Sequence, residues 1–195
     1  MKTLSVSTRT ICGIEELPSH DSAGVTHVLS ITDPGWPALA AFSAYGDIRR
    51  TKLEFHDVIE PGPGLVLPSR EDLEEVLRFG ADMNASAAEG VGGHLLVHCH
   101  MGISRSTAAM VTLMAQAEPD ADEDGFFDTL RGIRARAWPN SLMISFADDL
   151  LGLNGRLTQA LARHYAHQIV HQPDLAHMIE HDGGRGREVD MGRRA

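Results

Sequence analysis

A short segment of the chain combines a thiol, a glycine, a guanidinium and a hydroxyl at close spacing. It runs through His98, Cys99, His100, Met101, Gly102, Ile103, Ser104, Arg105 and Ser106. A cysteine thiolate is a strong nucleophile, and a planar guanidinium nearby can bind two oxygens of a tetrahedral oxyanion. Gly102 permits backbone conformations that a side chain would obstruct. These residue types indicate nucleophilic attack on a bound oxyanion.

The elements around this segment predict where it points. Residues His94 to Cys99 form a short apolar run, typical of a buried central strand, and Ser104 to Gln116 has a helical pattern. At such a junction, loop amides and the positive end of the helix converge on one anion site. A free thiol is only about 3 % ionised at pH 7, and such surroundings favour its thiolate form.

The remaining pattern alternates strands and helices, which favours an α/β fold. We expect a central, mostly parallel sheet of about four to five strands, flanked by helices in three layers. Further strands are expected at Leu4 to Val6, Thr26 to Thr32 and Lys52 to His56. Helical segments are expected at 11–18, 36–45, 122–137 and 141–170, and after the N-cap Ser69, with Asp72 reaching back to free amides.

The chain of 195 residues and 21.2 kDa has the length of one domain. We expect a single domain over 1–171. From residue 172 the composition becomes polar and rich in glycine and arginine, which favours a flexible tail over 172–195.

The charge balance argues against polyanionic partners. There are 17 basic and 27 acidic residues, for a net charge of −10, so binding to nucleic acid or an anionic membrane is not expected. No apolar run approaches the ~20 residues that span a bilayer, and no secretory signal is expected at the N-terminus. Two cysteines, Cys12 and Cys99, are too few for a disulfide scaffold, so a cytoplasmic location is the expectation. The oligomeric state stays open.

The segment around Cys99 resembles the Cys-x5-Arg signature of the cysteine-dependent protein tyrosine phosphatase superfamily, and most closely its compact dual-specificity members. Every fixed position of the fuller form, His-Cys-x-x-Gly-x-x-Arg-Ser/Thr, is present. The stretch Thr26 to Ile31 is similar to a strand of that family, and Arg136, Pro139 and Asn140 resemble its R-x-x-P-N stretch. The resemblance extends over about residues 3 to 160.

This resemblance implies a phosphomonoester hydrolase with the family's three-layer α/β fold. Cys99 would attack phosphorus, Arg105 would bind the phosphoryl oxygens, Ser106 would help the sulfur to leave, and His98 would orient the cysteine. Backbone amides would complete a phosphate cradle over His100, Met101, Gly102, Ile103, Ser104 and Arg105. The resemblance implies no metal and no cofactor.

The resemblance also implies a general acid on a loop after a strand. Asp57 is the first candidate, although it lies further before Cys99 than the acid of compact dual-specificity enzymes. Glu60 is the alternative, and Asp33 follows a different strand. The acid must be protonated while the thiol is ionised, which predicts a bell-shaped, mildly acidic pH profile.

Several alternatives remain open. The substrate is expected to be phosphotyrosine protein, with phosphoserine or phosphothreonine as further candidates. A phosphoinositide or another small phosphate ester is an alternative, although the loop carries no lysine. A phosphoprotein-binding module is the alternative of another class.

Weaker signals lie outside the cysteine segment. His164, His167 and His171 share one helix face, which a polar surface explains better than a metal site. Cys12 could pair with Cys99 under oxidation, but an ordinary core cysteine is the simpler interpretation.

Overall fold

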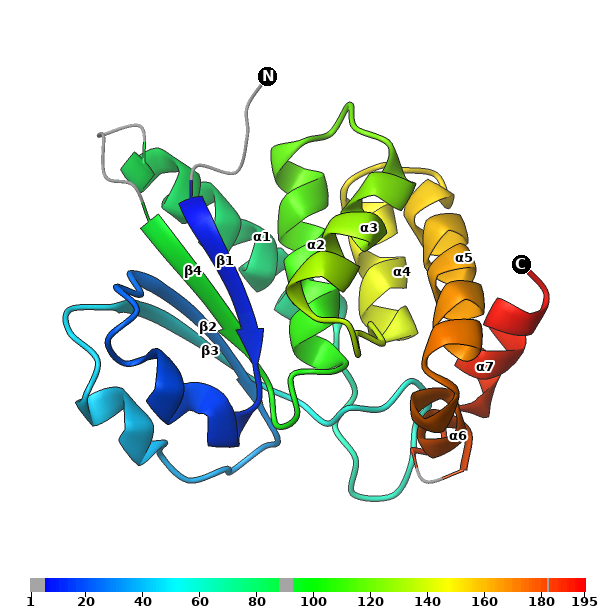
Figure 1. Ribbon diagram of the computed structural model, residues 1–195, viewed down its shortest axis with the longest axis horizontal. Helices are drawn as coiled ribbons and strands as arrows, with labels where there is room; N and C mark the ends of the chain where they lie inside the picture. Colours follow the sequence, from blue (N-terminus) through cyan, green and yellow to red (C-terminus); the bar gives the residue numbers. More distant parts are fainter. Residues whose placement is uncertain (1–5, 88–92, 182) are drawn as a thin grey trace.

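The computed structural model describes residues 6–87, 93–181 and 183–195 (Figure 1). Its centre is a sheet of four parallel strands in the order β1-β4-β2-β3. The strands are β1 (Val6–Cys12), β2 (His27–Thr32), β3 (Arg49–Glu54) and β4 (Gly93–His98). In register, His98 pairs with Cys12 on one side and with Ser30 on the other, so three strands end side by side. Their following loops therefore meet at one edge of the sheet, as the expected parallel sheet requires.

The two faces of this sheet are covered by different kinds of helix (Figure 1). One face carries the α-helical layer, and the other carries two short 3-10 helices, η1 (Ile14–His20) and η2 (Ala40–Ser43). The α-helices are α1 (Arg70–Ala87), α2 (Arg105–Ala117), α3 (Glu123–Ile133), α4 (Ser141–Leu150), α5 (Arg156–His171), α6 (Pro173–His181) and α7 (Gly186–Arg193). The α/β fold with a parallel sheet flanked by helices, expected from the sequence, is confirmed.

Strand β4 is buried on both faces, because successive side chains enter different parts of the core. Leu95 and Val97 pack with the α-helical layer, whereas Leu96 packs with the residues of η1 and η2. This explains the unbroken apolar run in the sequence and fixes the end of β4, where Cys99 follows, in the middle of the sheet.

The expected cap of α1 is present. Asp72 accepts hydrogen bonds from both the amide (2.8 Å) and the hydroxyl (2.7 Å) of Ser69, and the Ser69 hydroxyl accepts one from the Asp72 amide at 3.2 Å. The glycines expected to end this helix, Gly90 and Gly92, lie outside the described residues, as does Leu4 of the first expected strand.

The single long helix expected over 141–170 is wrong, because two helices, α4 and α5, occupy it. Gly152, Asn154 and Gly155 between them have φ values of 67°, 54° and 84°, a left-handed conformation that ends a helix. The Asp148 carboxylate then accepts from the amides of Gly155 (2.6 Å) and Thr158 (2.8 Å) and caps the start of α5.

The C-terminal residues also differ from the expected polar tail, since they form α6 and α7. Leu175 and Val189 are buried, and a Cβ at Gly192 would lie 2.7 Å from the Cβ of Tyr165, so α7 packs closely on α5. Few apolar residues anchor this segment, and its fold depends on a packing surface that lies elsewhere in the chain. The domain boundary at residue 171 stays a prediction. No helix in the described part of the chain is long and apolar enough to cross a membrane.

Candidate active site

The loop from Cys99 to Arg105 is packed, backbone against backbone, on the turn that follows β1. Gly102 has φ of +68°, and a Cβ there would lie 2.6 Å from the carbonyl carbon of Cys12. At the facing glycine, Gly13, a Cβ would lie 2.9 Å from the carbonyl oxygen of His100, which accepts a hydrogen bond from the Ile14 amide at 3.0 Å. Only glycine fits both the conformation and the space at 102, which gives that motif position its physical reason.

An arginine outside the motif braces the same loop. Arg134 donates to the carbonyl oxygens of Met101 (3.0 Å) and Gly102 (3.1 Å). Its guanidinium also forms two 2.9 Å hydrogen bonds to the Glu16 carboxylate, which accepts from the Gly13 amide at 2.6 Å. The hydrogen bond from Arg134 lowers the pKa of Glu16 below its usual value. These hydrogen bonds therefore connect the loop after β4, the turn after β1 and the C-terminal end of α3.

Cys99 lies at the floor of the loop with its thiol beside a hydroxyl. Its Sγ is 3.2 Å from Oγ of Ser106, and both residues are buried. A hydroxyl in this position can donate to a thiolate, which is the contact expected from the resemblance. The role of that contact stays a prediction.

His98 is held in one orientation beneath Cys99. Its Nε2 lies 2.6 Å from Oγ of Ser30, and that oxygen accepts a hydrogen bond from Nε of Arg50 at 2.8 Å. Because Arg50 can only donate, the Ser30 hydroxyl proton is directed to His98. Burial lowers the pKa of His98 to about 4, so the ring is neutral at pH 7.

Arg105 is buried at the start of α2, with Nη1 of its guanidinium engaged. Its Nη1 donates to Oδ1 of Asp33 (2.6 Å) and to the carbonyl oxygen of Phe55 (2.6 Å). Its buried Nε has no hydrogen-bond partner among the described residues. Asp33 thus anchors Arg105, while the donor at Nε stays unsatisfied.

His100 flanks the arginine site. Its Nε2 accepts a hydrogen bond from the Asp33 amide at 3.2 Å, and its ring packs against Trp36 with centroids 4.2 Å apart. Burial, and then the charge of Arg105, lower the pKa of His100. The side chain therefore belongs to the rim of the site.

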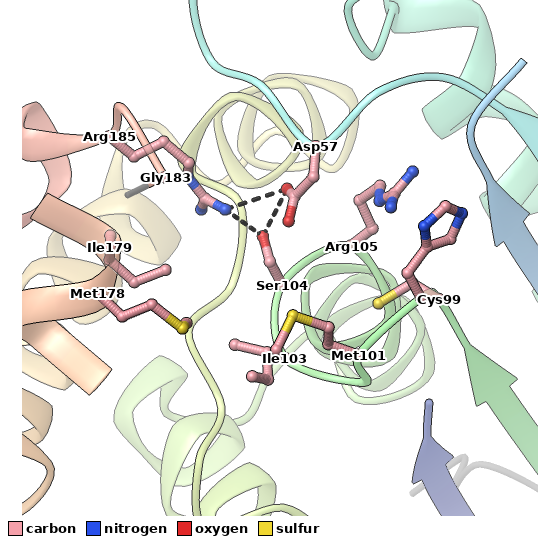
Figure 2. A pocket seen from close by; sticks show the side chains of 11 residues that line it. Asp57, Cys99, Met101, Ile103, Ser104, Arg105, Met178, Ile179, Gly183 and Arg185 are labelled. Atoms are coloured by element: carbon pink, nitrogen blue, oxygen red, sulfur yellow. Dashed lines mark hydrogen bonds and ion pairs between the residues drawn. The ribbon is translucent and has the colours of Figure 1, made fainter. Parts of the chain in front are cut away.

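Asp57 points into the same pocket and is surrounded by donors (Figure 2). Its Oδ1 accepts from Oγ of Ser104 (2.7 Å), Nδ2 of Asn140 (3.0 Å) and Nη1 of Arg185 (3.0 Å). Burial raises the pKa of Asp57, but the charges of Arg185 and Arg105, with the hydrogen bonds, outweigh it and hold the pKa below its usual value. The structure therefore favours an ionised Asp57 here, whereas a general acid must be protonated.

The alternative acid is placed differently. Glu60 forms an exposed ion pair with Arg187 and is not among the residues that line the pocket at Cys99. The geometry thus brings Asp57, rather than Glu60, into the pocket that Cys99 lines.

Arg185 is the residue that the sequence did not single out. It is 3 % exposed, and its Nη1 also donates to Oγ of Ser104 at 2.6 Å. Its Nη2 pairs with Oε2 of Glu188 at 2.6 Å. Arg185 lies 128 residues after Asp57, between two glycines, so no local pattern connects the two.

The pocket at Cys99 has a volume of about 320 Å³ (Figure 2). Its polar side chains are those of Cys99, His100, Arg105, Asp57, Ser104 and Arg185. Two elements supply its apolar walls. The loop contributes Met101 and Ile103, and α6 contributes Met178 and Ile179.

The remaining candidate residues from the sequence, three histidines and Cys12, do not form a common site. His164 is buried, where its Nε2 meets the carbonyl oxygen of Ala137 at 3.1 Å, while His167 and His171 stack on each other with centroids 3.9 Å apart. Within the described residues, no group of three or more histidine, cysteine or acidic side chains could hold a metal ion. Cys12 is a free, buried cysteine, and burial raises its pKa to about 12.

The sequence matches no protein-family model, and no curated protein is detectably similar to it. Solved structures match over most of the chain. Human DUSP28 is 18% identical, with 77% of this chain and 95% of that chain covered at a TM-score of 0.55. PTPMT1, in complex with PI(5)P, is 12% identical, with 75% and 91% covered at 0.52. A human tyrosine phosphatase-like serine/threonine/tyrosine-interacting protein is 19% identical, with 73% and 87% covered at 0.51.

The chain therefore has the α/β fold of the cysteine-dependent phosphatases, and within it the dual-specificity phosphatase architecture is the structural match. The resemblance in fold noted at the sequence level is confirmed.

Proposed function

We propose that this protein hydrolyses phosphomonoesters through a phosphocysteine at Cys99, with phosphotyrosine proteins as the main substrate class and phosphoserine or phosphothreonine as further substrates. The observation that carries the proposal is the position of the Cys99 thiol. It lies 3.2 Å from the Ser106 hydroxyl, at the floor of a pocket that also holds Arg105 and Asp57.

In the first step, the Cys99 thiolate attacks phosphorus, an S–P bond forms and the P–O bond to the leaving group breaks. The free Nε of Arg105 and the loop amides from His100 to Arg105 bind the phosphoryl oxygens as their charge redistributes. Asp57, when protonated, gives its proton to the departing oxygen.

In the second step, water attacks phosphorus and the S–P bond breaks. Asp57, now a carboxylate, accepts the proton of the water, and Ser106 donates a hydrogen bond to the thiolate that leaves. His98, neutral and fixed by Ser30, keeps the cysteine oriented. Inorganic phosphate is the product, and the chemistry needs no metal or cofactor.

The pocket supports an aryl phosphate. Met101, Ile103, Met178 and Ile179 provide apolar walls for a ring beside the phosphate site. Phosphoinositide hydrolysis is the alternative within the same chemistry, suggested by the PI(5)P bound to PTPMT1. The net charge of −10 and the lack of lysine in the loop disfavour it.

A binding function is the alternative of another class. One structural match is a tyrosine phosphatase-like serine/threonine/tyrosine-interacting protein. Here Cys99, Arg105, Ser106 and Asp57 are all present and share one site, so hydrolysis is the better supported function.

Hydrolysis of p-nitrophenyl phosphate with EDTA, between about pH 4.5 and 8, tests the proposal. We expect wild-type turnover that Cys99→Ser lowers by at least about 10³-fold. Cys12→Ser is the matched control, because Cys12 is also a free buried cysteine but does not line the pocket. Ser106→Ala should accumulate phosphocysteine and show a burst of nitrophenol. A folded wild type without activity, or an active Cys99→Ser, would contradict the proposal.

A further inference from the structure

The Arg185 side chain occupies the wall of the pocket opposite the nucleophile and contacts Asp57 directly (Figure 2). Its Nη1 is 3.0 Å from Oδ1 of Asp57 and 2.6 Å from Oγ of Ser104, which itself donates to Oδ1 of Asp57. An arginine and a hydroxyl of the nucleophile loop thus share the carboxylate that the proposed chemistry needs as a proton donor.

Buried contacts fix Arg185 in this position. Glu188 pairs with Nη2 of Arg185, and the same carboxylate accepts from Nε1 of Trp138 (2.8 Å) and from the Ser141 amide (2.7 Å). Arg185 and Glu188 are 3 % and 1 % exposed, so neither side chain is free to swing into solvent. The contact with Asp57 is therefore part of the folded core beside the pocket.

The local charges argue against a second phosphate-binding arginine. The two arginines, Arg105 and Arg185, are matched by three carboxylates, Asp33, Asp57 and Glu188. Arg185 lies between two of these carboxylates, so its charge is already balanced before a substrate arrives. The group beside the pocket that Arg185 contacts is therefore the Asp57 carboxylate.

We infer that Arg185 is a positioning residue that holds the Asp57 carboxylate in a buried ion pair, and that it thereby makes this site prefer esters with acidic leaving groups, aryl phosphates such as phosphotyrosine, over alkyl phosphates. This rests on the proposed function. To the proposed function it adds a preference among leaving groups, and it names Arg185 as the residue that causes this preference.

The selectivity follows from the leaving groups. A phenol such as the tyrosine side chain has a pKa of about 10, so its anion needs less help to depart than an alkoxide does. A serine or threonine alkoxide is far more basic and needs a proton as the P–O bond breaks. An acid that is held ionised penalises the second class more than the first. The apolar walls of the pocket favour the same aryl class.

The charged and titratable groups around Asp57 support this direction. Arg185 and Arg105 are cations that face it, and the titratable side chains of His100 and Tyr165 also interact with it. Burial alone raises the pKa of Asp57, and the pKa is held low because these two arginines, with the hydrogen bonds from Asn140 and Ser104, outweigh burial. Without Arg185, the burial effect would be opposed mainly by Arg105.

The test compares Arg185→Met, Arg185→Lys and the double variant Arg185→Met with Glu188→Gln. The double variant removes both charges of the buried Arg185–Glu188 pair, so Glu188 is not left as an unpaired carboxylate in the core if the single variant folds poorly. Arg187→Met is the matched control: it removes the same charge two residues away, where the guanidinium is exposed and paired with Glu60.

Two readouts are needed. Carboxyl ¹³C NMR, with Asp57→Asn as the assignment reference, follows the Asp57 titration independently of turnover. Steady-state kinetics then compares kcat/KM for a phosphotyrosine and a phosphoserine peptide of the same sequence across pH. Loss of Arg185 should raise the Asp57 midpoint and the basic limb of kcat/KM by at least about one pH unit. It should also increase the phosphoserine-to-phosphotyrosine ratio of kcat/KM by about tenfold. Arg185→Lys should restore most of the wild-type behaviour, and Arg187→Met should match the wild type.

An Asp57 midpoint that does not move in the double variant would overturn the inference, and so would an unchanged peptide ratio. Both results leave the proposed function standing if the wild type hydrolyses phosphotyrosine. A wild type that hydrolyses neither peptide nor p-nitrophenyl phosphate would overturn the proposed function and the selectivity together.

Discussion

The two walls of the pocket are built in different ways. On one side, nine consecutive residues from His98 to Ser106 contain the proposed nucleophile, the arginine proposed to bind the phosphate and the hydroxyl beside the thiol. On the other side, Arg185 reaches Asp57 across 128 residues of sequence, and Glu188 holds it through Trp138 and Ser141. The first wall, formed by residues 98–106, depends on residues that are adjacent in sequence. The second wall, formed by Asp57 and Arg185, depends on how α6 and α7 pack. A sequence motif can thus predict the reaction, whereas the contact that acts on the proton donor, Asp57, depends on the tertiary structure.

Gly102→Ala should disrupt the loop that contains Cys99 and Arg105, and we expect the largest effect from this variant. The new Cβ would lie 2.6 Å from the carbonyl carbon of Cys12, at a φ of +68°. We expect the free energy of unfolding to fall by about 3–5 kcal/mol, from strain plus overpacking, and kcat to fall by about 10²-fold. Urea unfolding and p-nitrophenyl phosphate turnover measure the two effects.

The matched control is Gly64→Ala. Gly64 has a similar φ of +72°, but open space surrounds the position of its Cβ. It should lose about 1–2 kcal/mol and keep its turnover. If both variants behaved alike, close packing of the loop on β1 would not be what requires Gly102.

Glu188→Gln tests the second wall. Glutamine keeps the shape of the side chain but leaves the buried guanidinium of Arg185 without its carboxylate partner on this side. We expect a loss of about 2–3 kcal/mol in the free energy of unfolding, measured by urea denaturation at pH 7.

Glu180→Gln is the control for that change, because Glu180 forms a similar ion pair with Arg193 at the surface. An exposed pair of this kind contributes less than about 1 kcal/mol. Equal losses in the two variants would show that the Arg185–Glu188 pair does not anchor α7 in the core.

Local signals predicted much of the fold. The apolar run that became β4, the cap formed by Ser69 and Asp72, and the strand after Thr26 each depend on residues close in sequence. The break between α4 and α5 was missed, although Gly152 and Gly155 mark it, because the apolar stripe continues across both helices. The C-terminal helices could not be predicted because their packing depends on distant partners such as Tyr165, against which Gly192 lies.

The candidate site divides in the same way. The positions of Cys99, Arg105 and Ser106 follow from the motif, and Asp57 was placed by the family resemblance. Its ion pair with Arg185 could not be predicted, because neither residue carries a local pattern that points to the other. Asn140 was noted only as part of a similar stretch, and its contact with Asp57 required the tertiary structure. Arg134, which braces the loop carbonyls, was not predicted for the same reason.

Glu16→Gln should have the smallest effect and sharpens the comparison, since Glu16 and Arg134 are tertiary support for the locally encoded wall. Both side chains are partly exposed (44% and 25%), so the loss in unfolding free energy at pH 7 should stay below about 1 kcal/mol. The pKa of Glu16 is lowered in the folded state, chiefly by its hydrogen bond to Arg134. Its stabilisation is therefore complete at neutral pH and disappears as the pH falls below the usual glutamate value, about 4.3.

Urea unfolding of the wild type and Glu16→Gln at neutral and acidic pH measures this small difference, with Glu74→Gln as the control for an exposed helical ion pair with Arg70. The two unfolding curves should converge on acidification, and kcat should change less than about threefold, because Arg134 keeps its bonds to the loop carbonyls. A difference that grew as the pH fell would mean that Glu16 is not held as a carboxylate by Arg134. A large loss of kcat would mean that the nucleophile loop, despite its local encoding, depends on this tertiary contact as strongly as Asp57 depends on Arg185.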